Sequence, residues 1–232
     1  MKIAQIGTGN MGKIVASLAH DAGHSITTLV TSGDSELIAQ ELAERIGGAD
    51  VVIDFSIAGA VRRTVEACLI ARVPLVEGST GWQDELPDIE RNVRERMGAV
   101  VYGANFSIGV NLFYRIVGHA AELFARFDQY ETFIEEQHHS RKKDAPSGTA
   151  LKLKEIVSAH IGHEFAVSST RAGSIPGTHR VGFDGPADQV LLEHTARSRD
   201  GFALGALAAA EWIIGKTGFF EFTEVVDEIV AK

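Results

Sequence analysis

Short apolar runs alternate with amphipathic segments through the first hundred residues, and this alternation constrains the fold more than any other feature of the chain. Apolar runs predict strands at residues 3–6, 26–30, 51–55, 74–76 and 100–102. Apolar residues at helical spacing predict helices at 11–22, 35–46 and 61–71. Strands and helices that alternate at this length predict an α/β fold with a parallel, doubly wound sheet.

Three glycines, Gly7, Gly9 and Gly12, stand where the first predicted strand leads into the first predicted helix. Their G-x-G-x-x-G spacing suits a dinucleotide, because it permits a tight turn, a close approach of pyrophosphate and close packing of helix on strand. We therefore predict cofactor contacts from these glycines and from the first helical turn, namely Asn10, Met11 and Lys13. A glycine-rich turn without a ligand is the alternative, which the strand–helix context disfavours.

The end of the second predicted strand bears on which nicotinamide cofactor is used. NAD-binding chains place an acidic residue there, about 20 residues after the glycines, to bind the ribose. This chain has Thr31 and Ser32 instead, and its first acidic residue there is Asp34. Thr31 and Ser32 could donate hydrogen bonds to a 2′-phosphate, with positive charge from Lys13. NADPH is therefore favoured, and NADH remains an alternative.

The loops after the third, fourth and fifth predicted strands should lie at one edge of the sheet. Ligands of open α/β sheets bind outside the carboxyl ends of the strands. We therefore predict that the nicotinamide end of the cofactor contacts Phe55, Gly78, Ser79, Thr80, Ala104, Asn105 and Phe106. The alternative for the Gly-Ser-Thr-Gly stretch is an ordinary turn between a strand and a helix.

The regular alternation stops near residue 110, which predicts a second domain of α+β type inserted into the first. Its predicted elements are helices at 110–125 and 147–161 and strands at 132–136, 181–183 and 189–196. Helices at 201–214 and 222–230 would pack back on the first domain. The expected boundaries are 1–109 with 200–232 for dinucleotide binding, and 110–199 for substrate binding.

The composition excludes several classes of protein. The formal net charge is −9, which argues against non-specific binding to nucleic acid or to membranes. No apolar run is long enough to cross a bilayer. The single cysteine, Cys68, cannot form an internal disulfide and suits a reducing compartment, so we expect a cytoplasmic protein.

The segment 136–150 concentrates groups that hold anions and transfer protons. His138, His139, Lys142 and Lys143 lie within six residues and lead into a predicted helix start at Asp-Ala-Pro-Ser-Gly-Thr. Pro146 suits the first helical turn. The backbone N–H groups at a helix start bind carboxylates and phosphates. The segment therefore predicts a site for a small polyanionic substrate that is held and then protonated.

Individual groups in and near this segment suggest how the substrate is held. Asp144 or Ser147 could cap the predicted helix. The N–H groups of Gly148 and Thr149, with the Thr149 hydroxyl, could bind one carboxylate. Arg171 and Arg199 are candidates for a second carboxylate, because a guanidinium binds a carboxylate through two hydrogen bonds.

Metal binding by the two adjacent histidines is not expected. Adjacent residues of a strand point to opposite faces, so His138 and His139 would not converge on one ion. No Cys, Asp or Glu completes a familiar metal-ligand spacing with them. The prediction is that the site holds no metal.

Four motifs make the chain similar to a known family, the 4-hydroxy-tetrahydrodipicolinate reductases, also called dihydrodipicolinate reductases. They are G-x-G-x-M-G at 7–12, Gly-Ser-Thr-Gly at 78–81, Asn-Phe-Ser-Ile-Gly-Val at 105–110 and His-His-x-x-Lys-x-Asp-Ala-Pro-Ser-Gly-Thr-Ala at 138–150. The last motif is the most specific, and the resemblance spans nearly the whole chain. One departure is Ser140, where many members have arginine.

The resemblance implies a Rossmann-type domain, an inserted mixed-sheet domain that also mediates a homotetramer, and NADPH or NADH as the hydride source. It implies reduction of a cyclic dicarboxylate, 4-hydroxy-tetrahydrodipicolinate, to tetrahydrodipicolinate in lysine and diaminopimelate biosynthesis. By motif position, His138 resembles the proton donor, and Lys142 resembles the lysine that assists it or binds substrate. His139, Gly148 and Thr149 resemble residues that contact the substrate carboxylates.

Two other classes of function remain as alternatives. One is a different two-domain oxidoreductase, such as an amino-acid or sugar dehydrogenase, which would leave the His-His-x-x-Lys motif unexplained. The other is a nucleotide-sensing regulator that keeps the fold without catalysis. Loss of His138 or Lys142 would favour the regulator, and the chain retains both.

Overall fold

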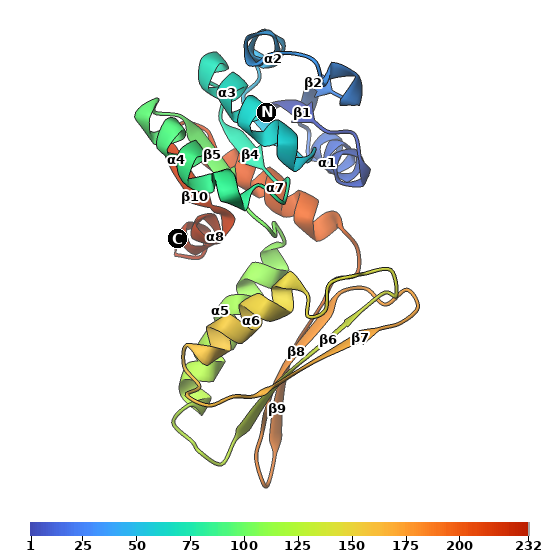
Figure 1. Ribbon diagram of the computed structural model, residues 1–232, viewed down its shortest axis with the longest axis vertical. Coiled ribbons are helices and arrows are strands. Elements are labelled where there is room, and N and C mark those ends of the chain that lie inside the picture. The colour runs from blue at the N-terminus through green and yellow to red at the C-terminus, as the bar shows by residue number, and fades with distance from the viewer. Residues whose placement is uncertain (232) are drawn as a thin grey trace. The chain divides into compact units, whose positions relative to one another are not determined.

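The computed structural model describes residues 1–231 (Figure 1). The chain divides into two compact units, and the second is inserted into the first. The first unit comprises Met1–Ile108 and the chain from Arg199 onward, and the second comprises Gly109–Ser198.

The first unit is built on a six-stranded sheet in which all paired strands are parallel. The strand order is β10-β5-β4-β3-β1-β2. This arrangement confirms the predicted doubly wound sheet and adds one strand, β10, that the sequence pattern did not predict. The strands are β1 Lys2–Ile6, β2 Ser25–Val30, β3 Val51–Asp54, β4 Leu75–Glu77, β5 Ala99–Tyr102 and β10 Gly218–Glu221.

Helices cover both faces of this sheet, and each face has its own apolar core. One core includes residues of α2 Ala39–Ile46, α3 Val61–Ala71 and α4 Leu86–Glu95. The other includes residues of α1 Asn10–Asp21, α7 Asp200–Ile213 and α8 Phe222–Val230. Helix α2 begins later than predicted, because residues 35–38 form a turn and an irregular segment after the short 3₁₀ helix Ser32–Asp34.

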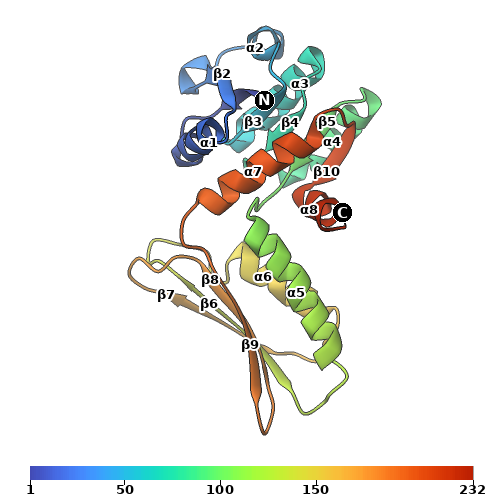
Figure 2. The same cartoon turned by 180° about the vertical axis from the view of Figure 1, so that it is seen from behind.

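The second unit is a four-stranded mixed sheet with two helices on one face (Figure 2). The strand order is β7-β6-β8-β9, with β6 and β7 parallel and the other pairs antiparallel. The predicted α+β composition is confirmed, although strand β7 was not predicted. The elements are α5 Ile108–Phe124, β6 Glu131–His138, α6 Gly148–Ser158, β7 Ala166–Arg171, β8 Thr178–Asp184 and β9 Gln189–Thr195.

Strand β6 alternates between buried and more exposed side chains, and this alternation positions the candidate site. Ile134 packs in the core with Phe113 of α5 and Leu153 of α6. Because side chains repeat every second residue on a strand, Glu136 and His138 lie on the same face as Ile134, and both are buried. The strand therefore carries a carboxylate and an imidazole into an otherwise apolar layer.

The helices in the described part of the chain are too short or too polar to span a membrane. The longest of these helices, α5, has 17 residues. None of the helices in residues 1–231 combines the length and apolar character that a membrane span requires.

Candidate functional site

The turn from β1 to α1 brings the three predicted glycines together in a crowded backbone. Gly7 has a φ of +90°, and a Cβ there would lie 2.5 Å from the Phe55 carbonyl oxygen. A Cβ at Gly12 would lie 2.1 Å from the Gly7 carbonyl oxygen. Both glycines are required for this turn, because any side chain would overlap backbone atoms.

Gly9 differs from the other two glycines, because a Cβ there would meet no atom within 4 Å in the described chain. It stands at the N-cap of α1, where no described side chain caps the helix and no acidic residue occupies the first turn. Asn10, Met11 and Lys13 lie in that first turn, as predicted. This open, uncapped helix start fits a bound pyrophosphate, because its N–H groups favour an anion.

The loop after β2 is organised by an acidic residue. Asp34 accepts hydrogen bonds from the Thr31 backbone N–H at 2.8 Å and from the Thr31 hydroxyl at 3.1 Å, and it pairs with Arg45. The hydrogen bond from the Thr31 backbone, followed by that from Arg45, lowers the pKa of Asp34. Because the Thr31 hydroxyl already donates to Asp34, it is not available for a 2′-phosphate in this arrangement. Ser32 is exposed next to it.

The loops predicted to contact the nicotinamide are interlocked. A Cβ at Gly78 would lie 2.2 Å from the Phe55 ring, which in turn meets the Phe106 ring edge-on at 6.0 Å. The Ser79 hydroxyl accepts a hydrogen bond from the Ser56 backbone N–H at 3.1 Å. Thr80, Ala104 and Asn105 are the remaining predicted contacts, and they lie at the same strand ends. Thr80 and Ala104 are exposed. The Asn105 side-chain oxygen accepts a hydrogen bond from the Ser107 N–H at 2.9 Å.

Two buried carboxyl groups, which the sequence pattern did not single out, support these loops. Asp54 ends β3 and accepts from the Ser56 N–H at 2.7 Å, while Glu77 ends β4 and accepts from the Ser79 N–H at 2.7 Å. Each leaves one oxygen without a donor among residues 1–231. Burial, and then the charge of Asp54, raises the pKa of Glu77 well above its usual range. Burial likewise raises the pKa of Asp54, so the folded state favours the protonated form of Glu77 more than the unfolded state does.

Replacement of Glu77 by glutamine is expected to raise stability above neutral pH by on the order of 1 kcal/mol, the equivalent of one pKa unit. The folded state binds the Glu77 proton more tightly than the unfolded state, so wild-type stability declines as pH rises from the unfolded pKa to the folded pKa. The amide would mimic the protonated acid at every pH. Urea unfolding at pH 6 and pH 9 measures the difference, with the exposed Glu95→Gln as control. A Glu77→Gln protein that is less stable at both pH values would contradict the expectation.

Glu136 is the first residue of the predicted substrate segment 136–150, and its side chain is fully buried in the second unit. Its Oε1 accepts hydrogen bonds from the Ser147 N–H at 3.0 Å, the Ser169 hydroxyl at 2.7 Å and Arg171 Nη2 at 2.7 Å. Although burial opposes ionisation, hydrogen bonds from Ser147, Arg171 and Ser169 lower the pKa of Glu136 to about 2. The carboxylate is therefore ionised at any physiological pH.

Two imidazoles lie beside the other oxygen of Glu136. His138 Nδ1 is 3.2 Å and His179 Nε2 is 3.7 Å from Oε2, and the two rings meet edge-on with centroids 5.1 Å apart. Burial lowers the pKa of both rings, and the charge of Glu136 opposes this effect at His138. Burial and then the charge of His138 lower the pKa of His179 to about 4. The sequence offered no signal for His179, because it comes from β8, 41 residues after His138.

The cations of this segment are partly neutralised within the second unit. Lys142 Nζ lies 2.9 Å from the Asp144 carboxylate. Arg171 is one of the two arginines predicted to bind a substrate carboxylate. In the structure it pairs with Glu136 and donates a hydrogen bond to the Asp144 carbonyl. Arg199, the other candidate, belongs to the first unit and stands at the N-cap of α7.

The start of α6 resembles the predicted anion site with one correction. Ser147 is the N-cap, and its hydroxyl accepts a hydrogen bond from the Ala150 N–H at 3.2 Å. Pro146 therefore precedes the helix and is not in its first turn. Gly148 is exposed, with no described atom within 4 Å of a Cβ position, and Thr149 and His139 are half-buried. Of the predicted side chains, His138, Ser147 and Arg171 join the Glu136 cluster directly, whereas no contact of Lys142, His139 or Thr149 with Glu136 is found among the described residues.

The Glu136 cluster also places three potential metal-ligand atoms, from Glu136, His138 and His179, within 4.8 Å of one another. The sequence argument against a metal considered His138 with His139 and could not anticipate this grouping. The ion pair with Arg171 already balances the charge of Glu136. Pairing with Arg171 therefore accounts for the ionised state of Glu136.

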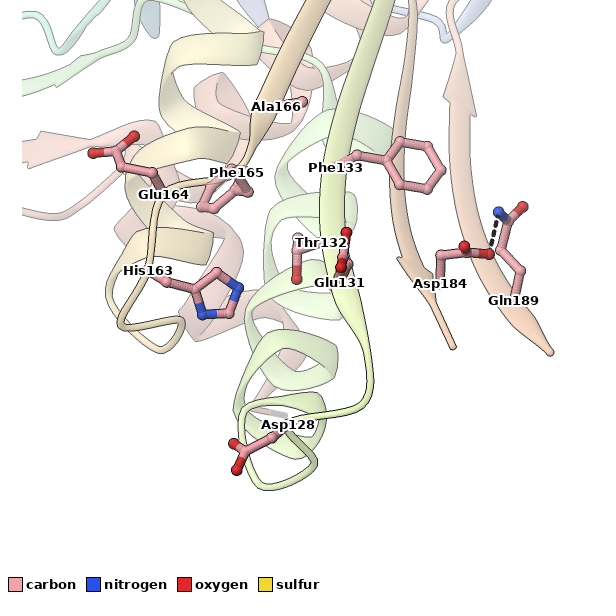
Figure 3. A pocket seen from close by; sticks show the side chains of 10 residues that line it. All are labelled: Asp128, Glu131, Thr132, Phe133, His163, Glu164, Phe165, Ala166, Asp184 and Gln189. Atoms are coloured by element: carbon pink, nitrogen blue, oxygen red, sulfur yellow. Dashed lines mark hydrogen bonds between the residues drawn. The ribbon is translucent and has the colours of Figure 1, made fainter. Parts of the chain in front are cut away.

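A separate surface pocket of about 640 Å³ lies at the opposite end of β6 from His138 (Figure 3). It is open and polar, and Glu131, Thr132 and Phe133 at the start of β6 line it together with Asp184 and Gln189. None of the predicted site residues contributes to it. The predicted catalytic residue His138 lies at the other end of β6, next to Glu136.

Comparison with known families accounts for both halves of the chain. The family described as "Dihydrodipicolinate reductase, N-terminus" matches residues 1–106, and "Dihydrodipicolinate reductase, C-terminus" matches 109–226. A 4-hydroxy-tetrahydrodipicolinate reductase from Christiangramia forsetii is 32% identical and covers 99% of each chain. A protein of the same description from Methanosarcina mazei is 34% identical, over 97% of this chain and 88% of its own.

Solved structures with low sequence identity share the fold. A dipicolinate-bound dihydrodipicolinate reductase from Paenisporosarcina sp. TG-14 gives a TM-score of 0.77 at 20% identity, over 95% of this chain and 97% of its own. An amine dehydrogenase from Mycobacterium smegmatis gives a TM-score of 0.64 at 10% identity, over 97% of this chain and 95% of its own. These likenesses confirm the predicted combination of a Rossmann-type domain with an inserted mixed sheet.

Proposed function

Because the chain belongs to the dihydrodipicolinate reductase family, and is an NAD(P)H-dependent oxidoreductase, we propose that it reduces 4-hydroxy-tetrahydrodipicolinate to tetrahydrodipicolinate. The cofactor is NADPH or NADH. The reaction would serve lysine and diaminopimelate biosynthesis. The alternative of a non-catalytic nucleotide-sensing regulator is not favoured, because the relatives are described as reductases.

One observation carries this proposal beyond the family match. In the second unit, a buried and ionised Glu136 adjoins His138, and the loop that follows carries Lys142 and the exposed start of α6. A cyclic dicarboxylate needs both kinds of group, a proton donor at the ring and positive or N–H groups at its carboxylates. Holding the ring in one orientation contributes a large part of the acceleration.

The bound nicotinamide supplies the hydride. Among the residues of this chain, His138 donates the matching proton, since its intrinsic pKa lies nearer neutrality than that of lysine. The ammonium group of Lys142 attracts the dianionic substrate. Gly148 and Thr149, at the start of α6, and His139 contact the carboxylates. The first unit holds the cofactor through the turn around Gly9 and through the loops at Phe55 and Gly78.

A coupled assay tests the function directly. The product of dihydrodipicolinate synthase is supplied as substrate, and the absorbance of NADPH or NADH is followed as the protein is added. We expect oxidation of at least one cofactor in proportion to protein concentration. Failure to oxidise either cofactor with fresh synthase product would overturn the proposal.

Replacing Lys142 with alanine is expected to raise KM for the dicarboxylate about tenfold or more, with a smaller change in kcat. The loss of one charge-assisted contact, about 1.5–3 kcal/mol, accounts for an effect of this size. Steady-state kinetics at saturating cofactor measure both constants. Lys152→Ala, on the exposed side of α6, is the matched control. An unchanged KM in the Lys142 variant would show that this lysine does not bind substrate.

We also propose that the second unit mediates a homotetramer, as the family resemblance implies, in addition to binding substrate. Leu191 on β9 is 46% exposed and points to the sheet face away from the two helices, which leaves apolar surface there for a partner subunit. Light scattering coupled to size-exclusion chromatography measures the mass. A monomer at micromolar concentration would contradict this assignment without affecting the proposed reaction.

A further inference from the structure

The Glu136 carboxylate is the centre of a hydrogen-bond network in the second unit. Its Oε1 joins β6 to two other parts of the unit: the N-cap of α6 through the Ser147 N–H, and β7 through Ser169 and Arg171. Arg171 extends this network to the Asp144 carbonyl, next to Lys142. One carboxylate oxygen therefore ties the substrate segment to the sheet.

The other oxygen, Oε2, is not used by this network. It is buried and accepts no hydrogen bond from any residue between 1 and 231. The nearest polar atoms are His138 Nδ1 at 3.2 Å and His179 Nε2 at 3.7 Å, and His138 Nδ1 is likewise unpartnered in the described chain. A buried carboxylate oxygen and a buried ring nitrogen 3.2 Å apart stabilise each other when the nitrogen carries a proton, because each is otherwise costly to desolvate.

Burial lowers the pKa of His138, and Glu136 is the charge that most strongly opposes this effect and favours a proton on the ring. Glu136 and Asp144 are the anions that act on it, and the cations are Lys142 and Arg171. His179, from β8, faces the same ring but is neutral at physiological pH, since its pKa is about 4. His179 therefore does not compete with His138 for the charge of Glu136.

The opposite nitrogen of the His138 ring has an unusual neighbour. A Cβ at Gly177 would lie 3.1 Å from His138 Nε2, which is closer than most real contacts. Gly177 therefore packs against this edge of the ring, and any side chain at position 177 would press on Nε2. This is the ring atom that can reach a substrate when Nδ1 is held by Glu136.

We propose that Glu136 is a positioning residue for the general acid: its carboxylate holds the Nδ1–H of His138 and thereby presents the Nε2 proton to the substrate. The inference rests on the proposed function, because it takes His138 as the acid. In the protonation step the Nε2–H bond of the imidazolium breaks, and its electron pair stays on nitrogen. The proton bonds to the ring atom of the substrate that receives the electron pair displaced by hydride addition.

The decisive variant is Glu136→Gln, which keeps the size of the side chain and an oxygen for the three donors but removes the negative charge. We expect kcat to fall roughly tenfold or more, with KM changed by less than about threefold. The acid must be protonated to act, so activity declines as pH rises through its pKa. Without the carboxylate this decline should move about one unit or more toward lower pH.

Glu135→Gln is the matched control, because Glu135 is the neighbouring residue on β6 and has a side chain that is 44% exposed. This control should keep the wild-type pH profile. Glu136→Asp retains the charge at a greater distance from His138 and should recover part of kcat and of the pH profile. It also serves as the test variant if Glu136→Gln does not fold.

The pKa of His138, measured by NMR titration of its ring in each variant, separates this inference from the proposed function. We expect a lower pKa in Glu136→Gln and an unchanged pKa in Glu135→Gln. A shifted pKa in a protein that lacks reductase activity would support the role of Glu136 and overturn the reaction. Unchanged values for the pKa, kcat and pH profile in Glu136→Gln would overturn the inference and leave the reaction standing.

Discussion

Replacement of His138 by glutamine is expected to lower kcat by about 10²- to 10⁴-fold, the usual contribution of a general acid, with KM changed by less than about threefold. Glutamine can fill the same space beside Glu136 but cannot donate a proton at neutral pH. The carboxylate contacts proposed for Lys142, Gly148 and Thr149 would remain, so binding should survive. Steady-state kinetics with saturating NADPH or NADH give both constants.

His160→Gln provides the control for this experiment, because His160 is exposed and lies in the same unit, after the end of α6. It should behave as wild type in both constants and in thermal unfolding. A His138→Gln enzyme with full kcat would show that another group donates the proton. In that case Lys142 would be the next candidate, because it lies on the same loop and its charge acts on His138.

Replacement of Gly12 by alanine is expected to destabilise the protein at or above the upper end of the usual range for overpacking, about 1–3 kcal/mol. The added Cβ would lie 2.1 Å from the Gly7 carbonyl oxygen, and neither backbone segment can move without disturbing β1 or α1. At about 2–4 °C per kcal/mol for a chain of this size, the melting temperature should fall by roughly 6–12 °C. Differential scanning calorimetry without cofactor measures the effect.

Gly9→Ala is the informative comparison, because a Cβ there meets no described atom within 4 Å and the backbone φ of −68° suits alanine. It should melt within about 2 °C of wild type, since surface substitutions usually change stability by no more than about 0.5 kcal/mol. If the start of α1 binds pyrophosphate, Gly9→Ala should nevertheless weaken cofactor binding at least tenfold by titration calorimetry. Equal stability of the Gly9 and Gly12 variants would contradict the steric argument.

The fold of the first unit could be predicted to a large extent, because its buried strands are continuous apolar runs. The run from Val51 to Ile53, for example, is entirely buried. Strand β7 escaped prediction for the opposite reason. It is an edge strand with mostly exposed side chains, and Ser168, Ser169 and Thr170 show no apolar alternation. Strand β10, Gly-Phe-Phe-Glu, has only two apolar residues and leads directly into α8, so it shows no apolar run of its own.

The candidate sites were predictable where neighbouring residues in the sequence act together. Gly7, Gly9 and Gly12 serve one turn, and His138 and Lys142 lie on one strand end and the loop after it. Glu136 stood at the start of the same segment, but its spacing alone gave no reason to single it out. Its burial and contacts depend on β7, which the local pattern did not predict. They also depend on the pairing of β6 with β7 and β8, which no local pattern shows.

The sequence by itself determined the doubly wound sheet, the dinucleotide turn and the family, because these follow from local periodicity and from motifs of adjacent residues. The tertiary structure alone decided which charges meet. It paired Arg171 with Glu136, placed His179 next to His138, and buried Asp54 with Glu77. Such pairings arise when strands distant in sequence become neighbours, and burial then sets which of the groups keep a proton.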